Sequence, residues 1–303
     1  MREERRKRRK RQQIITLVVC ALVLAALIWG IATVVRKLTN YGNRSIASSQ
    51  SDIQEDQPTD TSTADQTVED RFAGVARNSY DAAGFYKEDG FLRYGDGTLG
   101  SEVGVDISSH QQSVDWEAVK AAGVDFAILR AGYRGYTEGA IQEDETFLTN
   151  LAAAKAAGLK VGVYFFSQAL DKAEAVEEAE FVLNLLDGAE LDYPIFFDWE
   201  DIEAEARTDG MDSVTLTACA VAFCKRVELN GYRAGVYFNQ RFGFEELDLR
   251  DLQDYELWLA EYALSPSFPY HFDVWQYAND GMLSGVDGPV DLNLAFVESR
   301  TAE

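Results

Sequence analysis

The sequence predicts an α/β fold in which eight strands close a TIM-like barrel, and three observations lead to this prediction. From residue 101 onward, short apolar, β-branched or aromatic runs alternate with amphipathic stretches, which is typical of a parallel sheet. The C-terminal part instead carries three strand-like runs with no long helix between them. No glycine-rich phosphate loop follows any run, which disfavours the alternative of an open doubly wound sheet. Five βα units followed by three strands can close such a barrel.

The expected elements follow from these runs in chain order. Strands are predicted over 103–108, 125–133, 160–168, 194–200, 233–239, 256–262, 272–278 and 289–296. Amphipathic periodicity predicts helices over 114–122, 143–157, 171–186 and 213–230. Gly123, Gly158 and Gly231 lie where helices should end. The predicted barrel domain covers residues 101–299.

The first segments of the chain predict a membrane anchor. Residues 1–13 form a basic tail, and residues 14–35 are 22 residues without a charge, long enough as a helix to span about 33 Å. The apolar run is longer than the core of a signal peptide and lacks a clear small-x-small cleavage site, so we expect it to stay uncleaved. The positive-inside rule then puts residues 1–13 in the cytoplasm and the C-terminal part outside the cell. The lipid bilayer is thus an expected partner through residues 14–35, and the expected location is the cell membrane, with a single pass.

Two segments separate the anchor from the barrel. Residues 36–72 become rich in Ser, Thr, Asp, Gln and Asn, and such a segment cannot bury enough apolar surface to offset its ordering entropy. It is therefore predicted to be a flexible extracellular linker. Residues 73–100 contain turn pairs and predict a small hairpin-like extension before the barrel.

Charge and composition exclude several classes of function. The 303 residues carry a formal net charge of −23, and residues 1–37 hold 10 of the 28 basic residues but 2 of the 51 acidic ones. The rest of the chain therefore carries −31, which argues against nucleic acid as a partner. With only two histidines, His110 and His271, a histidine-rich metal site or a Ser-His-Asp hydrolase is not expected. Three cysteines exclude a disulfide scaffold, and no cofactor or metal is expected.

Acidic residues at strand ends carry the expected chemistry. Asp106 ends the first predicted strand, Asp198 and Glu200 end the fourth, and Asp291 lies in the last. The i, i+2 spacing puts Asp198 and Glu200 on one face of a strand. Four carboxyl groups crowded at one mouth cannot all ionise easily, which raises the pKa of at least one. A proton donor at neutral pH results, as hydrolysis of a glycosidic bond requires.

Each acid taken alone also fits a role without catalysis. An Asp at the end of a strand is often a helix cap or a turn residue, and a cluster of oxygens suits a hard cation. No D-x-D-x-D-G calcium loop is present. Neither a cap nor a turn accounts for two acids on the inward face of the apolar strand that holds Asp198 and Glu200.

Aromatic and amide side chains near strand ends are the candidate substrate contacts. Aromatic rings can stack on sugar faces, and amides can bind hydroxyl or acetamido groups. The aromatic candidates are Tyr133, Tyr164, Phe166, Tyr237, Tyr262 and Trp275. The amide candidates are Gln168, Asn239 and Gln276.

Seven motifs in order make residues 101–298 resemble glycoside hydrolase family 25. They are GVDISSHQQSVDW, FAILRAGY, GVYFFSQA, FDWE, GVYFN, WLAEY and WQYA…VDLN. The resemblance implies a flattened (β/α)5(β)3 barrel that hydrolyses the β-1,4 bond between N-acetylmuramic acid and N-acetylglucosamine in peptidoglycan. It implies that Glu200 is the general acid, Asp198 its partner, and Asp106 and Asp291 the other site acids. Gln112 departs from the pattern, because many relatives have Gly there.

The expected function is therefore a membrane-anchored extracellular muramidase, with peptidoglycan glycan strands as its partner. An anchored enzyme reaches only nearby wall, so local remodelling is the expected role. A wall-binding barrel without activity is one alternative, although none of the four acids is replaced. A glycosidase of other specificity is the second alternative.

Overall fold

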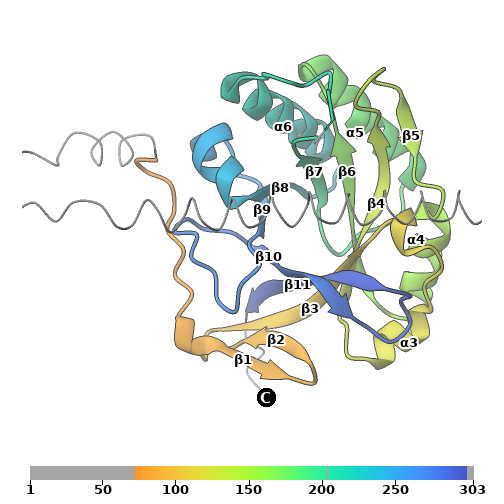
Figure 1. Cartoon of the computed structure of the whole chain (residues 1–303), viewed down its shortest axis with the longest axis vertical. Coiled ribbons are helices and arrows are strands. Elements are labelled where there is room, and N and C mark those ends of the chain that lie inside the picture. Colours follow the sequence, from red (N-terminus) through yellow and green to blue (C-terminus); the bar gives the residue numbers. More distant parts are fainter. Residues whose placement is uncertain (1–71, 203, 299–303) are drawn as a thin grey trace, which may run out of the picture. The chain divides into compact units, whose positions relative to one another are not determined.

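Eight strands of the chain close into a barrel (Figure 1). The computed structural model describes residues 72–202 and 204–298. The barrel strands are β3 (Leu99–Ile107), β4 (Phe126–Arg134), β6 (Lys160–Ser167), β7 (Ile195–Trp199), β8 (Ala234–Asn239), β9 (Glu256–Ala260), β10 (Val274–Met282) and β11 (Pro289–Glu298). Their order is β3-β11-β10-β9-β8-β7-β6-β4, and a parallel β3–β4 pairing closes the ring. Strand β11 is antiparallel to both neighbours, and the other barrel pairs are parallel. The predicted eight-stranded barrel is confirmed.

Four α-helices connect the first strands. They are α3 (Trp116–Ala121), α4 (Phe147–Ala156), α5 (Lys172–Leu186) and α6 (Ser213–Glu228). An Asp caps the N-terminus of α3, α5 and α6, where its side chain accepts backbone N–H groups that have no partner within the helix. The helix expected from residue 143 begins at Phe147, because Ile141–Glu143 forms a short strand, β5, antiparallel to β4.

The fifth βα unit differs from the prediction. After β8 the chain forms only a π-helical turn, Phe242–Glu246, and a 3-10 turn, Leu249–Asp251. Four side chains of this stretch are buried at irregular spacing, namely Phe242, Leu247, Leu249 and Leu252. Because these side chains pack on the core from several directions, no regular helical stripe forms there.

A hairpin precedes the barrel and packs against it. Strands β1 (Phe85–Glu88) and β2 (Phe91–Tyr94) are antiparallel, and the Asp89-Gly90 turn has positive φ at both residues. The Phe85 ring lies 5.4 Å from that of Trp275 on β10. Phe72, the last residue of the predicted linker, is 4% exposed and its ring lies 4.9 Å from that of Tyr270. Phe72 therefore belongs to the core and not to the predicted linker.

The barrel interior is filled by side chains from alternate strand positions. Phe126, Phe196 and Trp258 are among the buried residues of this inner cluster. Gly104 lies against the Phe126 ring and Gly235 against the Phe196 ring, so that a Cβ at either glycine would collide with the ring. The interior is thus solid, and chemistry is confined to the end of the barrel where the polar residues lie.

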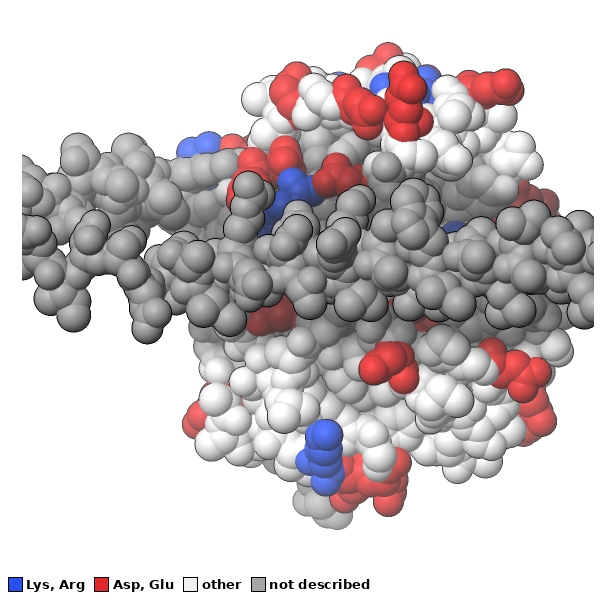
Figure 2. Space-filling model, in the orientation of Figure 1, with Lys and Arg blue, Asp and Glu red and all other residues white. Residues whose placement is uncertain are grey.

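The exterior is acidic, as the composition indicates. Asp and Glu side chains are spread over the visible face, with Lys and Arg in few places (Figure 2). Within the described residues, no helix is both long and apolar enough to cross a membrane. The predicted tail 1–13, the predicted span 14–35 and residues 36–71 of the predicted linker lie outside the described residues.

Candidate active site

The four predicted acids meet at one end of the barrel. Asp106 lies near the end of β3, and its register partner on β11 is Asp291. Asp198 lies on β7 between Phe166 of β6 and Tyr237 of β8, and Glu200 follows two residues later. Adjacent register partners have neighbouring side chains, so the pleat directs all four carboxyl groups toward the same space.

Burial and crowding keep protons on these acids. The pKa of Asp106 is raised to about 8, mainly by burial and also by the charges of Asp291 and Glu200, while hydrogen bonds from Asn293 and Gln276 oppose the shift. Burial likewise raises the pKa of Asp198 well above its ordinary value, with contributions from Glu200 and Asp106. These four groups therefore titrate as a set in which not every member is ionised near neutral pH.

The two less buried acids are shifted in the same direction. Burial raises the pKa of Glu200, and the charges of Asp291 and Asp201 raise it further. Burial also raises the pKa of Asp291, to about 6. Glu200 is half-buried, so it can both hold a proton and reach a ligand.

A hydrogen-bonded frame fixes Asp106. Gln276 Nε2 and Asn293 Nδ2 both donate to Asp106 Oδ2, at 2.9 and 2.8 Å. Trp258 Nε1 in turn donates to Asn293 Oδ1 at 2.9 Å. The Tyr237 hydroxyl donates to Gln276 Oε1 at 3.2 Å. The orientation of Asp106 is thus set by β9, β10 and β11 together.

Asp198 has a different environment. Its Oδ1 atom is buried and has no hydrogen-bond partner within the part of the chain that the structure describes. The charge of Arg130 partly opposes the rise in the pKa of Asp198. The Arg130 guanidinium does not bind Asp198, however, but Asp144 at 2.8 Å and Ser109 Oγ at 3.0 Å. Asp198 therefore presents an acceptor that a ligand N–H could satisfy.

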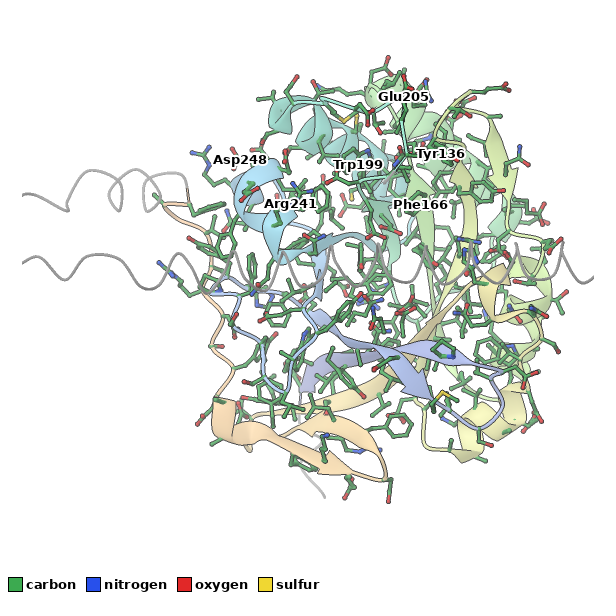
Figure 3. The ribbon with its side chains drawn as sticks, viewed as in Figure 1. Tyr136, Phe166, Trp199, Glu205, Arg241 and Asp248 are labelled. Carbon is green, nitrogen blue, oxygen red and sulfur yellow. The ribbon has the colours of Figure 1, made fainter. Side chains whose placement is uncertain are left out.

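Aromatic rings surround the acids. Tyr164 and Tyr237 point into the barrel and pack on Trp258, with ring centroids 6.0 and 4.8 Å apart from it. Tyr262 is 55% exposed and Tyr133 is 37% exposed. Phe166 is half-buried at the end of β6 (Figure 3). The exposed rings offer flat apolar faces to a ligand.

Three predicted substrate contacts are placed differently. Trp275 is fully buried on the outer face of β10, where Nε1 donates to the Glu261 carbonyl. Its neighbour Gln276 points inward, and successive strand residues face opposite sides, so the assignment of Trp275 to the site is wrong. Gln168 is also fully buried, and both ends of its amide bind protein groups. Asn239 Oδ1 accepts the backbone N–H of Phe242 at 3.1 Å.

Three residues of the site were not predicted. Asn293 lies two residues after Asp291, and Trp258 lies four residues before Tyr262, so the same alternation rule could have found both. Arg130 shares the inward face of β4 with Ile128, ahead of a register shift between Arg130 and Gly132. No feature of the sequence marks that shift.

Comparisons with known proteins agree with this architecture. The profile of glycosyl hydrolases family 25 matches residues 105–286. The autolytic lysozyme of Clostridium acetobutylicum is 32% identical over 191 residues, which cover 63% of this chain and 54% of that protein. Lysozyme M1 of Streptomyces globisporus is 26% identical over 204 residues, covering 63% of this chain and 66% of that protein.

Solved structures have the same fold. The modular autolysin LytC from Streptococcus pneumoniae has a TM-score of 0.57 and 25% identity, covering 70% of this chain and 52% of that one. The Clostridium perfringens spore cortex lytic enzyme SleM has a TM-score of 0.54 and 25% identity, covering 64% and 67%. The chain spans about half the length of the autolytic lysozyme and of LytC.

Proposed function

The chain belongs to glycosyl hydrolases family 25, and from this premise we propose that it is a muramidase acting on peptidoglycan. The bond it cleaves is the β-1,4 bond between N-acetylmuramic acid and N-acetylglucosamine. The observation that carries the proposal is the set of four acids at one end of the barrel, all with raised pKa values. The names of the relatives, two of them lysozymes, support the same substrate.

Glu200 is the general acid. Its raised pKa favours the protonated carboxyl, which can donate a proton to the oxygen of the leaving sugar. Asp291 contributes to this state, because its negative charge disfavours ionisation of Glu200. After the sugar leaves, the carboxylate of Glu200 takes a proton from the attacking water.

Asp198 orients the 2-acetamido group of the muramic acid residue. The acetamide N–H supplies the donor that Asp198 Oδ1 lacks, and such a bond favours the ionised carboxylate. The acetamide oxygen then attacks the anomeric carbon as the glycosidic bond breaks, and the carboxylate stabilises the positive charge of the oxazolinium ion. Water opens this ring from the opposite face, which restores the β configuration.

Residues 14–35 hold the enzyme at the outer side of the cell membrane. The charge-free apolar run and the basic block before it support this topology. The anchor restricts the enzyme to nearby wall, which suits local remodelling. Protease added to intact wall-less cells should remove the C-terminal part and spare residues 1–13, and the reverse pattern would contradict the topology.

The products of digestion test the bond and the mechanism. The full chain in detergent is incubated with purified peptidoglycan, and the fragments are reduced with borohydride and weighed by mass spectrometry. Muramitol ends are expected, and glucosaminitol ends would show that the other glycosidic bond is cleaved. NMR of the first-formed sugar, before mutarotation, should show the β anomer; an α anomer would show inversion and exclude the acetamide as nucleophile.

A further inference from the structure

A buried amide links the end of β6 to the main chain of Glu200. Gln168 follows β6 directly and is fully buried. Its Nε2 donates to the backbone carbonyl of Glu200 at 3.1 Å. Its Oε1 accepts the Thr208 hydroxyl at 2.7 Å. One side chain thus joins Glu200 to the segment that leads from it to α6.

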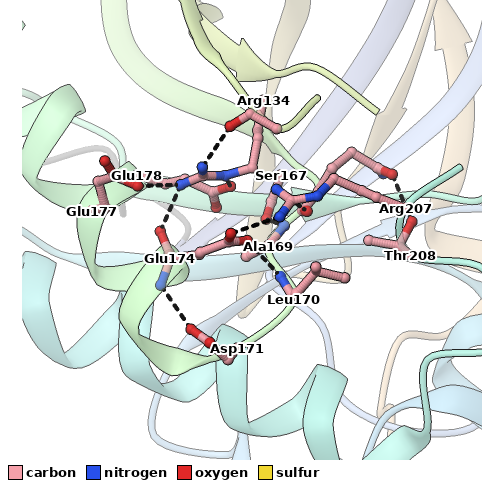
Figure 4. A network of polar contacts seen from close by, with 12 residues as sticks. Arg134, Ser167, Ala169, Leu170, Asp171, Glu174, Glu177, Glu178, Arg207 and Thr208 are labelled. Carbon is pink, nitrogen blue, oxygen red and sulfur yellow. Dashed lines mark hydrogen bonds and ion pairs between the residues drawn. The ribbon is translucent and has the colours of Figure 1, made fainter. Parts of the chain in front are cut away.

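That segment is fixed at Arg207 and Thr208, as Figure 4 shows. Thr208 is 6% exposed. The Arg207 backbone N–H donates to the Tyr136 carbonyl at 2.8 Å, and its guanidinium binds Glu174 of α5 at 2.6 Å. The same guanidinium donates to the Gln168 carbonyl at 3.5 Å. The chain after β7 is therefore held by β6, α5 and the β4–β5 connection.

A second arginine, Arg134, binds residues next to these contacts. Arg134 is 4% exposed and binds Glu178 at 2.6 Å and Glu177 at 2.8 Å. It also donates to the Gly139 carbonyl at 2.7 Å. Gly139 has a φ of +72°, and a Cβ there would collide with the Arg207 guanidinium. The support is therefore closely packed, and Gly139 permits the approach of Arg207.

We propose that Gln168 and Thr208 are positioning residues that fix the main chain at Glu200 and thereby aim its carboxyl group at the leaving oxygen. The proposal rests on the proposed role of Glu200 as acid. An amide is needed at 168 because it must donate to a carbonyl and accept from a hydroxyl at the same time. A displacement of about 1 Å in a catalytic group can reduce the rate about 100-fold, so such a restraint matters for turnover.

Matched valine substitutions test the proposal on turnover. Thr208→Val removes the hydroxyl that holds Gln168, and Thr217→Val removes an equally buried threonine hydroxyl on α6, outside this network. We expect Thr208→Val to lower kcat on peptidoglycan about 10- to 100-fold with little change in KM, and Thr217→Val to leave kcat unchanged. Thr208→Ser should recover most of the rate. Wild-type kcat in a folded Thr208→Val enzyme, or equal losses in both valine variants, would overturn the proposal.

A second readout does not depend on turnover. The Glu200 carboxyl is titrated by carbon-13 NMR in the full chain, with Glu200→Gln to assign its signal. In Thr208→Val the pKa of Glu200 should move down toward its ordinary value as solvent enters, while Thr217→Val should leave it unchanged. An unchanged titration in Thr208→Val would overturn the proposal even if the wild type proved unable to cleave peptidoglycan. Thr208→Ala replaces the valine variant if that one does not fold.

Discussion

Two regions of the barrel bury aspartates and treat them in opposite ways. Asp144, next to α4, is 1% exposed, and burial alone would raise its pKa. Hydrogen bonds from Ser109 and Thr146 and the charge of Arg130 outweigh burial and hold that pKa below its usual value. Asp106 and Asp198 are 7% and 5% exposed, and their pKa values are raised.

These aspartates are buried to a similar extent, so the difference between their pKa values comes from their bonding partners. Among residues 72–202 and 204–298, neither Asp106 nor Asp198 forms an ion pair, while Asp144 binds Arg130 at 2.8 Å. A buried acid that is paired with a cation stabilises the fold, whereas a buried acid without a cation costs desolvation free energy, as is expected of a group placed for chemistry. Substitution of one acid from each region tests this distinction.

The largest effect is expected at the acid that reacts. Glu200→Gln keeps the shape of the side chain but removes the proton, so hydrolysis should fall roughly 10²- to 10⁴-fold. The release of reducing ends from peptidoglycan measures this, with circular dichroism to verify folding. Glu117→Gln, on the surface of α3, is the matched control and should retain activity. Near-normal turnover by folded Glu200→Gln would show that another group donates the proton.

The next effect concerns the paired acid. Asp144→Asn leaves Arg130 largely buried without its counter-charge, because the Arg130 side chain is 12% exposed. Removal of one partner of a buried pair costs roughly 3–5 kcal/mol in the free energy of unfolding. Urea unfolding followed by tryptophan fluorescence measures the change. Stability equal to that of the wild type would mean that the pair contributes nothing and would remove the basis of the comparison.

A smaller effect of opposite sign is expected at the unpaired acid. Asp106→Asn removes a carboxyl that must be desolvated on folding and keeps an acceptor for Gln276 and Asn293. The free energy of unfolding at pH 7 should rise by about 1–2 kcal/mol while hydrolysis falls, as is common where function strains the fold. The same urea titration applies. A loss of stability as large as that of Asp144→Asn would show that Asp106 is structural.

The sequence was sufficient for the barrel because its signals are local. Strand composition and helix periodicity repeat along the chain, and the helix caps Asp115, Asp171 and Asp212 bind backbone N–H groups only two or three residues further on. The two short turns after β8 do not follow from the sequence, because tertiary packing and not a local periodicity sets the positions of their buried leucines. The burial of Phe72 was missed because it depends on Tyr270, far along the chain.

The sequence predicts those site residues whose direction follows from the alternation of side chains along a strand. Asp198 and Glu200 follow from i, i+2 spacing, whereas Trp275 and Gln276 were both assigned to the site although consecutive strand residues cannot share a face. The position of Gln168 was not accessible by such rules, since its partners belong to the segment after β7. Contacts between loops distant in sequence leave no periodic signal.

The most gradual effect, and the smallest per pH unit, is the pH dependence of stability. Burial raises the pKa of Asp106 to about 8, against roughly 3.9 in an unfolded chain, so the folded state binds more protons between these values. Stability from this group is therefore complete at low pH and declines as pH rises toward 8; for Asp144, whose pKa is lowered, stability declines as pH falls. Loss of Asp106 should thus flatten the decline between about pH 4.5 and 8.

Urea midpoints of the wild type and of Asp106→Asn, measured across this range, check the expectation. One proton changes the slope of the free energy of unfolding against pH by at most about 1.4 kcal/mol per pH unit. The stability curves of the wild type and of Asp106→Asn should therefore separate gradually as pH rises. Part of the decline should persist in the variant, because burial also raises the pKa of Glu178 to about 7. Parallel curves would show that Asp106 releases its proton as easily in the folded barrel as in the unfolded chain, and the contrast with Asp144 would then reduce to hydrogen bonding alone.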